Sequence, residues 1–393
     1  MSLLNKKIAI VGGGPGGLML AKLLQQAGTN VKVYERDLNE HARVQGSPLD
    51  LHEDSGLKAI IAAGLLDAFK QNFLPGADRT KLMNQHGEVL YSDHETSVEE
   101  DFSNPAFRPE ISRGALRKIL LDALLPGTVI WNSHFISMTP QGEGWMLSFK
   151  NGDPVYADLV IASDGANSKL RSYITGSKPF YSGITMLEGN IYEAGSMAPE
   201  MSGRLNGGKI MAFGKGRNIL MGQKGNDEIG FYASFQAEEK WAVSNGVDFS
   251  DKASVLDWFE REYAGWDRVW NELFEAASLP FVPRPIYCMP FDQNWDALPN
   301  LTMIGDAAHV MPPFAGEGAN MAMLDGLELS EALMSGRFNT VHEAIGAYEI
   351  SMRFRAAAAA RESLLNGKRM HSVDALEKML EFFSDSPVVS DHE

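Results

Sequence analysis

Cysteine is almost absent from this sequence, which has only Cys288 among its 393 residues. One cysteine forms no internal disulfide and no cysteine-based metal cluster, and such scarcity is typical of the reducing cytosol. Long apolar runs are also missing. The stretch from Ile8 to Ala21 has 14 residues with five glycines, too short for a bilayer span, and it lacks the cleavage site of a secretory signal. We therefore expect a cytoplasmic protein, with no membrane span and no bound metal.

Positive charge is scarce as well. Lys and Arg number 35 against 51 Asp and Glu, which gives a net charge of −16. A field of this sign repels nucleic-acid phosphates and anionic lipids, so neither is an expected partner. With 44% apolar and 22% charged residues the composition is that of a globular chain. The length suits two domains or one large composite domain.

The first 36 residues predict a strand, a helix and a second strand. A short β-branched run at Lys6–Val11 and another at Val31–Tyr34 have the composition of buried strands. Between them, Leu18–Gln26 has helical apolar spacing and ends before Gly28, a natural stop. The segment is therefore a βαβ unit, with a glycine-rich turn where the helix begins.

That turn contains the pattern Gly12-x-Gly14-x-x-Gly17, which predicts a dinucleotide site. The first glycine allows a tight turn, the second lets the backbone approach a pyrophosphate, and the third lets helix and strand pack closely. The helix N-terminus attracts the phosphates. Glu35 ends the second strand and can accept hydrogen bonds from a ribose diol. This carboxylate favours FAD or NAD, while the neighbouring Arg36 offers a partner for the extra phosphate of NADP.

Farther along, the pattern changes. Residues 181–283 contain β-like runs broken by Gly and Asn, which predict a mostly antiparallel sheet forming a separate layer over the substrate. Helical patterns are expected at 55–69, 113–124, 318–334 and from 341 to about 383, with a strand at 301–305.

Two further motifs follow expected strands: Asp164-Gly165 and Gly305-Asp306. In this order with the glycine turn, they resemble the landmarks of the group A flavoprotein monooxygenases, whose prototype hydroxylates para-hydroxybenzoate. The resemblance implies an α/β fold, with a Rossmann-like FAD-binding domain, an interleaved antiparallel β-sheet substrate domain and a long C-terminal helix. The implied boundaries are 1–75, 105–177 and 284–345 for the first domain, 76–104 and 178–283 for the second, and 346–393 for the bridging helix and tail.

The resemblance also implies the residues that hold FAD. Asp306 would hold a ribityl hydroxyl, Arg113 would lie beside the cofactor, and Asp164 would form a turn near it. The helix that begins near Gly316 would direct N–H groups at the flavin edge and stabilise negative charge on the reduced ring. The implied cofactor set is Gly12, Gly14, Gly17, Glu35, Arg36, Arg43, Asp50, Arg113, Asp164, Asp306, Pro313, Gly316, Gly318, Ala319 and Asn320.

The likeness extends to the tetracycline-inactivating flavin monooxygenases, through stretches such as Val33–Asp37, Leu49–His52 and Met303–Gly316. By that likeness Arg43 contacts NADPH and Asp50 contacts FAD. Each has a plainer alternative, a surface charge for Arg43 and a turn or cap for Asp50.

The implied substrate contacts are Glu188, Lys209, Pro313, Phe314 and Gly316. The last three would form the wall between flavin and substrate, and Phe314 could equally be plain core. The polar drug contacts of the family fall near Glu188, Lys209 and Gly230, and none of the three keeps the family's residue type. Such groups discriminate strongly between ligands, and Lys does not replace Arg at a bidentate site. Glu317 likewise stands where the family has an amide.

Two side chains and one helix receive an expected role outside these sets. Arg117 is expected to be a solvated helix charge, and His309 to order its loop, since no partner for it is visible in the sequence. The long C-terminal helix would bridge the two layers of a monomer, or else serve in dimerisation.

The implied reaction is a monooxygenation. NADPH reduces FAD, the reduced flavin takes up O₂ as a C4a-hydroperoxide, and an electron-rich carbon is hydroxylated. No residue is assigned to catalysis, because the flavin performs the chemistry. The first expectation is a tetracycline-type substrate, and hence antibiotic resistance. The alternatives are a hydroxylase of an unrelated phenol or polyketide, a flavin halogenase or dehydrogenase, and a binding protein that carries flavin without turnover.

Overall fold

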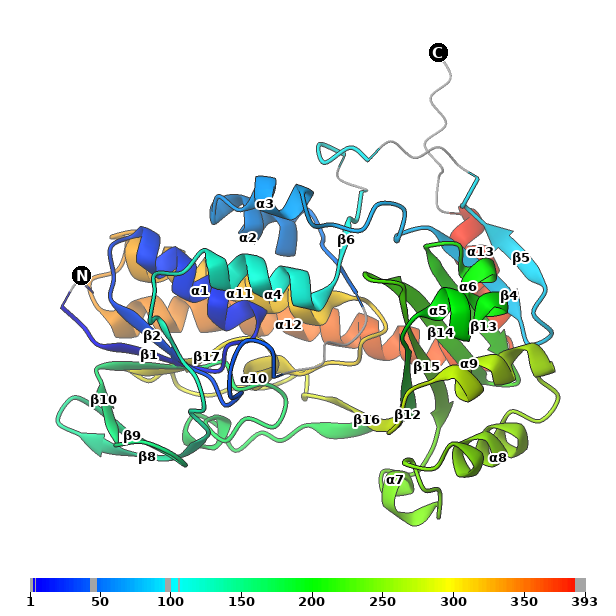
Figure 1. Ribbon diagram of the computed structural model, residues 1–393. Helices are drawn as coiled ribbons and strands as arrows, with labels where there is room; N and C mark the ends of the chain where they lie inside the picture. Colours follow the sequence, from blue (N-terminus) through cyan, green and yellow to red (C-terminus); the bar gives the residue numbers. More distant parts are fainter. Residues whose placement is uncertain (1–2, 4, 43–47, 96–99, 105–106, 386–393) are drawn as a thin grey trace.

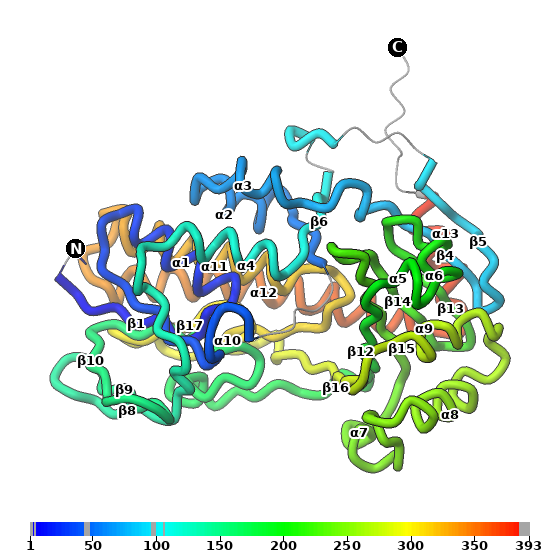
Figure 2. Tube along the Cα trace, in the orientation of Figure 1, coloured from blue at the N-terminus to red at the C-terminus, as the bar shows by residue number. Residues whose placement is uncertain are grey.

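The computed structural model describes the chain except for residues 1–2, 4, 43–47, 96–99, 105–106 and 386–393. Two halves lie side by side, each built on its own sheet, and helix α12 (Val341–Met370) runs along the first half and reaches the second (Figure 1). The trace in Figure 2 shows that the chain passes from one half to the other several times. No helix among the described residues combines the length and apolarity that a bilayer crossing requires.

The first half is built on a parallel five-stranded sheet in the order β17-β11-β1-β2-β7. Every residue of β1 and β11 is buried, as expected for strands covered on both faces. The strands are β1 (Ile8–Val11), β2 (Val31–Tyr34), β7 (Val129–Ile130), β11 (Leu159–Ala162) and β17 (Leu301–Met303).

Helix α1 lies against this sheet and packs on α11. The helices of this half, besides α12, are α1 (Pro15–Gln26), α2 (Gly56–Ala62), α3 (Leu66–Lys70), α4 (Arg113–Asp122), α10 (Asp306–His309) and α11 (Glu317–Met334). The single helix expected at 55–69 is therefore wrong. Gly64 adopts a φ of +68° between α2 and α3, a left-handed conformation that ends a helix.

Two small sheets complete this half. One is antiparallel, with β8 (Phe135–Gln141), β9 (Gly144–Phe149) and β10 (Val155–Ala157), and the other pairs β3 (Leu49–Asp50) with β6 (Glu110–Ile111). The second pair places Asp50 directly opposite Glu110.

The second half is built on a seven-stranded sheet in the order β16-β12-β15-β14-β13-β4-β5. All its pairings are antiparallel except that of β13 with β4, so the expected mostly antiparallel sheet is confirmed. Its strands are β4 (Thr80–Asn84), β5 (Val89–Ser92), β12 (Phe180–Ile191), β13 (Lys209–Gly214), β14 (Arg217–Lys224), β15 (Glu228–Gln236) and β16 (Val282–Cys288).

One face of this sheet packs on short helices, with Phe231, Trp258 and Phe274 in the shared core. These helices are α5 (Ala194–Met197), α6 (Pro199–Leu205), α7 (Trp241–Ser244), α8 (Lys252–Glu262) and α9 (Asn271–Ala276), with the 3₁₀ turn Arg268–Trp270 before α9. Because side chains alternate along a strand, Glu188, Lys209 and their neighbours two residues away occupy the opposite face, which is turned toward the first half.

The C-terminal helical tail is not continuous, in contrast to the expectation. The long helix α12 begins at Val341, as the sequence pattern predicts, and it ends at Met370. After a turn that contains the buried His371, α13 (Ala375–Asp385) packs on β4 and β13. His371 accounts for the break, because its ring binds the carbonyl oxygen of Gly367 and the Ser234 hydroxyl (2.7 Å each).

Candidate active site

In the glycine turn, Gly12 and Gly17 lie in close contact with neighbouring backbone atoms, whereas Gly14 faces open space. A Cβ on Gly12, whose φ is +110°, would lie 2.1 Å from the Ser163 carbonyl oxygen, and one on Gly17 would lie 2.3 Å from the Gly12 carbonyl oxygen. A Cβ on Gly14 would meet nothing within 4 Å. Open space at the N-terminus of α1 fits a pyrophosphate that approaches the backbone closely.

Glu35 is hydrogen-bonded to this turn. Its buried carboxylate accepts hydrogen bonds from the Gly13 amide (2.6 Å) and the Asp37 amide (3.0 Å). It is therefore fixed beside the glycine turn, where a ribose diol is expected. Arg36 is exposed, and Arg43 lies outside the described residues.

The expectation for Arg117 is wrong, because its side chain is buried rather than solvated. It donates to Asp37 at 3.1 Å and lies over the Trp131 ring at 5.3 Å. A cation and its partner carboxylate thus meet beside the end of β2.

The two loops that follow β11 and β17 are joined by a buried arginine that the sequence reasoning missed. Arg171 donates to the carbonyl oxygens of Ala307 (2.7 Å), Asp306 (2.8 Å) and Ala166 (2.9 Å). Asp164 shapes its own loop by accepting from the amides of Lys169 and Leu170. The Asp-Gly and Gly-Asp motifs are therefore one structural unit.

Asp306 stands at the edge of this unit, where FAD is expected. Burial raises the pKa of its carboxyl, against the opposing charges of His309, Arg113 and Arg171. This carboxylate accepts no hydrogen bond from the part of the chain that the structure describes. A Cβ on Gly318 would still be 4.0 Å from it, so an acceptor and space lie together, as a ribityl hydroxyl requires.

His309 has a partner that the sequence did not reveal. Its Nε2 atom is 2.6 Å from Asp325 of α11, and the same carboxylate accepts from the Gly305 amide (2.8 Å) and from Arg355 (2.7 Å). Burial opposes the charged imidazolium, but Asp325 outweighs it and raises the pKa of His309. This network fastens the Gly305-Asp306 loop to α11 and α12, in agreement with the loop-ordering role expected for His309.

Asp50 and the beginning of α11 are tied together by Asn320. The Asn320 amide donates to the carbonyl oxygens of Asp50 (2.8 Å) and Gly316 (3.1 Å), and its oxygen accepts from the His52 amide (3.0 Å). The His52 ring lies between the carboxylates of Asp50 (3.1 Å) and Glu317 (3.3 Å). The expected residues Asp50, Gly316 and Asn320 are therefore adjacent, and His52 supplies a cation beside Glu317.

This cation predicts a pH dependence of stability. Burial disfavours the charged ring, but hydrogen bonds to Asp50 and Glu317 outweigh it and raise the pKa of His52 to about 9. A raised pKa stabilises the fold fully below the unfolded value of about 6.5, and the contribution is lost as pH rises through 9. We expect His52→Gln to remove roughly 3 kcal/mol of unfolding free energy at pH 6 and far less at pH 10. Urea denaturation at the two pH values measures this; an equal loss at both would contradict it.

The wall opposite Asp50 comes from the seven-stranded sheet, and its polar side chains are already paired. Lys209 donates to Glu110 at 2.5 Å, and Arg284 holds Glu188 at 2.9 Å. Lys224 donates to the side chain of Asn190. Sequence reasoning missed Glu110, Asn190 and Lys224. Lys224 and Asn190 share the sheet face of Lys209 and Glu188 by strand alternation, a signal that could have found them.

Arg113 influences both walls electrostatically. Its positive charge lowers the pKa of Asp306 in the first half, against the larger effect of burial, and that of Lys224 in the second, alongside the larger effect of burial. Phe314 packs against the same buried apolar cluster as Met211 and Leu220 of the sheet, whereas Pro313 is exposed. Gly318 and Ala319 form the first turn of α11.

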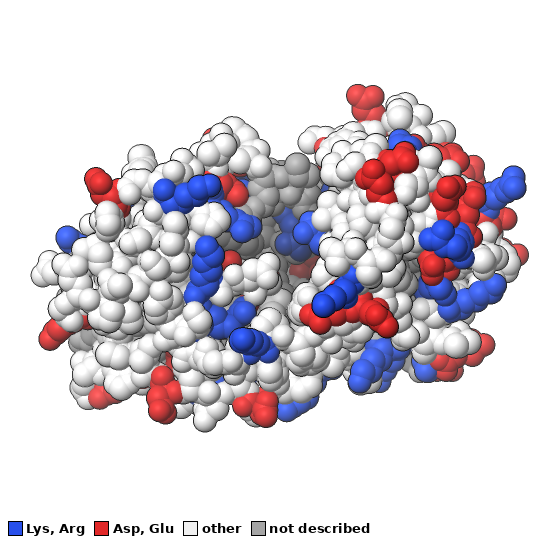
Figure 3. Space-filling view, turned by 90° about the horizontal axis from the view of Figure 1, so that it is seen from below, with Lys and Arg blue, Asp and Glu red and all other residues white. Residues whose placement is uncertain are grey.

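The residues between the two halves line a hollow. The side chains of Asp50, Lys209 and Glu317 are 24%, 36% and 20% exposed, yet burial is the largest single effect on the pKa of both Asp50 and Lys209. Side chains that water reaches while protein surrounds them belong to a recess. Figure 3 shows a deep hollow between the halves with Lys and Arg around it, although the chain is acidic overall.

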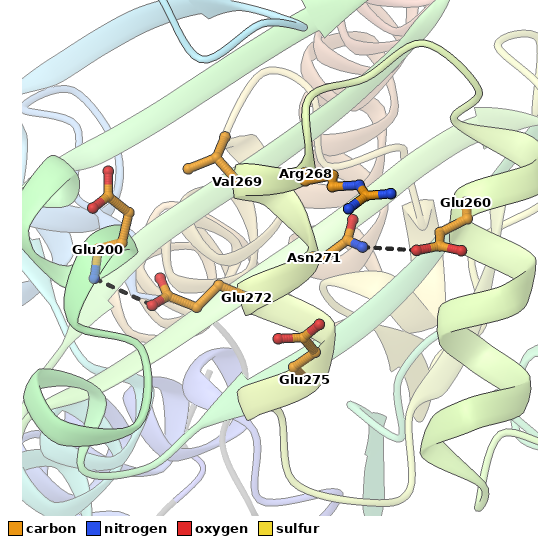
Figure 4. Close-up of a pocket in the computed structure, with 7 residues that line it drawn as sticks. All are labelled: Glu200, Glu260, Arg268, Val269, Asn271, Glu272 and Glu275. Atoms are coloured by element: carbon orange, nitrogen blue, oxygen red, sulfur yellow. Dashed lines mark hydrogen bonds between the residues drawn. The ribbon is translucent and has the colours of Figure 1, made fainter.

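A second hollow, on the outer side of the seven-stranded sheet, has a different character (Figure 4). Its lining includes Glu200, Glu260, Glu272 and Glu275. Glu272 accepts from the Met201 amide at 2.7 Å, and so holds α6 in place. Among the described residues no group of His, Cys, Asp or Glu is arranged to hold a metal ion.

Three comparisons bear on this site. A family model described as FAD binding domain matches residues 5–191 and 299–363. The chain is 28% identical over 374 residues to the monooxygenase penA of Penicillium thymicola, covering 83% of this chain and 84% of that protein. It is 24% identical over 381 residues to the 6-hydroxynicotinate 3-monooxygenase of Pseudomonas fluorescens, covering 91% and 90%.

Solved structures are similar throughout. HpxO of Klebsiella pneumoniae, complexed with FAD and uric acid, superimposes with a TM-score of 0.76 at 20% identity, covering 98% of this chain and 93% of that one. The tetracycline destructase Tet(55) does so with a TM-score of 0.75 at 18% identity, covering 97% and 96%. At these identities the likeness shows the fold alone.

Proposed function

Because the chain belongs to the FAD binding domain family and is an FAD-dependent monooxygenase, we propose that it uses NADPH and O₂ to hydroxylate an electron-rich polycyclic or aromatic substrate in the central hollow. A tetracycline-type antibiotic is the first candidate. The observation that carries this proposal is the meeting of the open glycine turn, the paired loops with Asp306, and the hollow with Asp50 and Lys209 on facing walls.

Different residues of the site hold different parts of FAD. The glycine turn and Glu35 hold the adenosine and pyrophosphate end, and Asp306, Arg113 and the N-terminus of α11 hold the flavin end. Bound FAD supplies the activation of O₂. The protein excludes water, fixes the distance between the two reactants, and presents N–H groups to negative charge.

Met211 and Leu220 lie next to polar Lys209 on the same sheet face, and Phe314 packs against the same apolar cluster as these two residues. The substrate therefore has an extended apolar surface and a polar edge. Tetracyclines have both.

A second candidate is favoured by the ion pairs of the sheet wall. Glu188 and Lys209 already hold Arg284 and Glu110, so they differ from the amide and arginine expected at a tetracycline site. A smaller phenol or heteroaromatic alcohol demands fewer polar contacts, and one relative at 24% identity is named for 6-hydroxynicotinate.

The deciding experiment is NADPH oxidation by the purified yellow protein, with and without tetracycline, with mass spectra of the product. A tetracycline-dependent rate and a product heavier by one oxygen atom establish the first candidate. Bound FAD without such a product rejects it, and the same assay with phenols then tests the second. NADH in place of NADPH measures the choice of reductant.

A further inference from the structure

Two carboxylates and one ammonium group meet where the two halves face each other. Pairing of β3 with β6 sets Asp50 directly opposite Glu110, and residues opposite in such a pair have Cβ atoms about 4.5–5.5 Å apart. Lys209 reaches them from β13 and donates to Glu110 at 2.5 Å. Glu110 itself is only 6% exposed, while Lys209 is 36% exposed. Lys209 is therefore the more accessible member, and the Glu110 carboxylate lies next to its ammonium, within reach of a hydroxyl group bound there.

The environment shifts the pKa values of the two carboxyl groups, Asp50 and Glu110, in opposite directions. Burial raises the pKa of Asp50, but His52 and Lys209 outweigh it and leave that pKa below the usual value. Burial also raises the pKa of Glu110, and Lys209 does not offset the combined effect of burial and Asp50. Asp78 adds further negative charge near the pair. Two acids whose pKa values move apart in one site are typical of a fixed charge beside a proton acceptor.

Lys209 remains a cation in this setting. Burial opposes its charge, but Glu110 and Asp50 outweigh burial and raise its pKa. Gly222 lies opposite Lys209 in the sheet, with no side chain of its own to cover the lysine stem. The ammonium therefore stands at the polar edge of the apolar group formed by Met211, Leu220 and Phe314.

We propose that the substrate is a phenol or enol, that its hydroxyl proton passes to the Glu110 carboxylate, and that the resulting oxyanion lies against the Lys209 ammonium. This inference rests on the proposed function and specifies the group that the hollow recognises. It makes Glu110 the proton acceptor and Lys209 the specificity-determining cation.

The step balances without another reactant. The substrate O–H bond breaks, its electron pair stays on the oxygen, and a new O–H bond forms on Glu110. Lys209 keeps its proton and exchanges one anionic partner for another. The oxyanion adds negative charge beside Glu110 and so favours its protonation. Ionisation also enriches the attached ring in electrons, which suits electrophilic oxygen transfer.

The test uses the FAD-loaded protein and 4-nitrophenol, whose phenolate is coloured. At a pH below the pKa of free 4-nitrophenol, the wild-type protein should bind it as phenolate without releasing a proton to the buffer. Glu110→Gln should still bind phenolate but release one proton for each ligand. Calorimetry in two buffers of different ionisation enthalpy counts that proton, and a purely structural role for Glu110 would not change the count.

Lys209→Met should weaken phenolate binding about tenfold or more, because a charge-assisted contact is lost, and Lys209→Arg should restore the coloured bound form. Lys118→Met removes an exposed ion pair with Asp122 and should change nothing. 4-Nitroanisole, which has no proton to lose, should bind about tenfold more weakly than 4-nitrophenol, because it cannot form the oxyanion.

Binding of 4-nitrophenol as the neutral phenol, no binding at all, or the same proton count in Glu110→Gln would each overturn the proposal. Measuring NADPH oxidation in the same preparation distinguishes a failure of this inference from a failure of the proposed function. A protein that shows substrate-dependent oxidation but binds the probe neutral keeps the proposed function and loses this inference. A protein that fails to retain FAD loses the proposed function.

Discussion

Arg171→Met is expected to abolish retention of FAD while the rest of the chain still folds. The guanidinium is buried and supplies the donors for three backbone carbonyl groups, two from the loop with Asp306 and one from the loop with Asp164. Methionine fills much of the volume but donates nothing. Each buried carbonyl left unpaired costs about 1–3 kcal/mol, and we expect roughly 3–5 kcal/mol of lost unfolding free energy in total.

The effect on the cofactor should exceed that on stability, because both loops belong to the proposed FAD site. We expect FAD affinity to fall by at least about 100-fold, equivalent to about 3 kcal/mol. Fluorescence titration of the apoprotein with FAD measures the affinity, and urea denaturation of the apoprotein measures the stability. Arg337→Met, at an exposed position, is the matched control. If Arg171→Met binds FAD like the wild type, the two loops do not form the cofactor site.

The glycine turn predicts opposite outcomes for two neighbouring substitutions. Gly14→Ala should leave the fold intact, within about 0.5 kcal/mol, because its Cβ meets no protein atom. It should weaken FAD binding about 100-fold, or about 3 kcal/mol, because the methyl group would take the space proposed for the pyrophosphate. Gly12→Ala should instead destabilise the apoprotein by roughly 3 kcal/mol or more, since it combines a positive φ with a Cβ 2.1 Å from Ser163, and strain and overpacking add.

Thermal unfolding of the two apoproteins and FAD titration of each separate these effects. An equal loss of stability in both variants would mean that Gly14 serves packing and not the cofactor. Retained FAD affinity in Gly14→Ala would place the pyrophosphate elsewhere.

Much of the fold could be predicted because the decisive patterns are local. Gly12, Gly14 and Gly17 lie within six residues of one another, and alternation marks the strands at 209–213 and 230–235. The FAD-binding fold and the monooxygenase class follow from three such motifs, and both are confirmed. The break between α12 and α13 could not be predicted in this way, because His371 forms its hydrogen bond with Ser234, which is 137 residues away along the chain.

The candidate site was predictable only in part, for the same physical reason. Asp50, Asp306 and Asn320 stand in recognisable motifs, and the structure brings Asp50 and Asn320 together. Arg171 and Glu110 act through partners 136 and 99 residues away, and nothing near them in sequence marks those contacts. Arg117 was misjudged and the partner of His309 was missed, because each pairs with an aspartate, 80 and 16 residues away respectively, that folding alone brings near.

The position of β17 at one edge of the five-stranded sheet has a consequence for biosynthesis. This strand pairs with β11, yet about 140 residues separate the two, and most of the second half is synthesised in between. Until the ribosome has passed Asp325, the Gly305-Asp306 loop has no anchor and β11 has an unpaired edge, which is prone to association with other chains. With FAD bound at this loop, as proposed, cofactor loading is expected late in synthesis, and FAD supply during expression should influence how much of this protein aggregates.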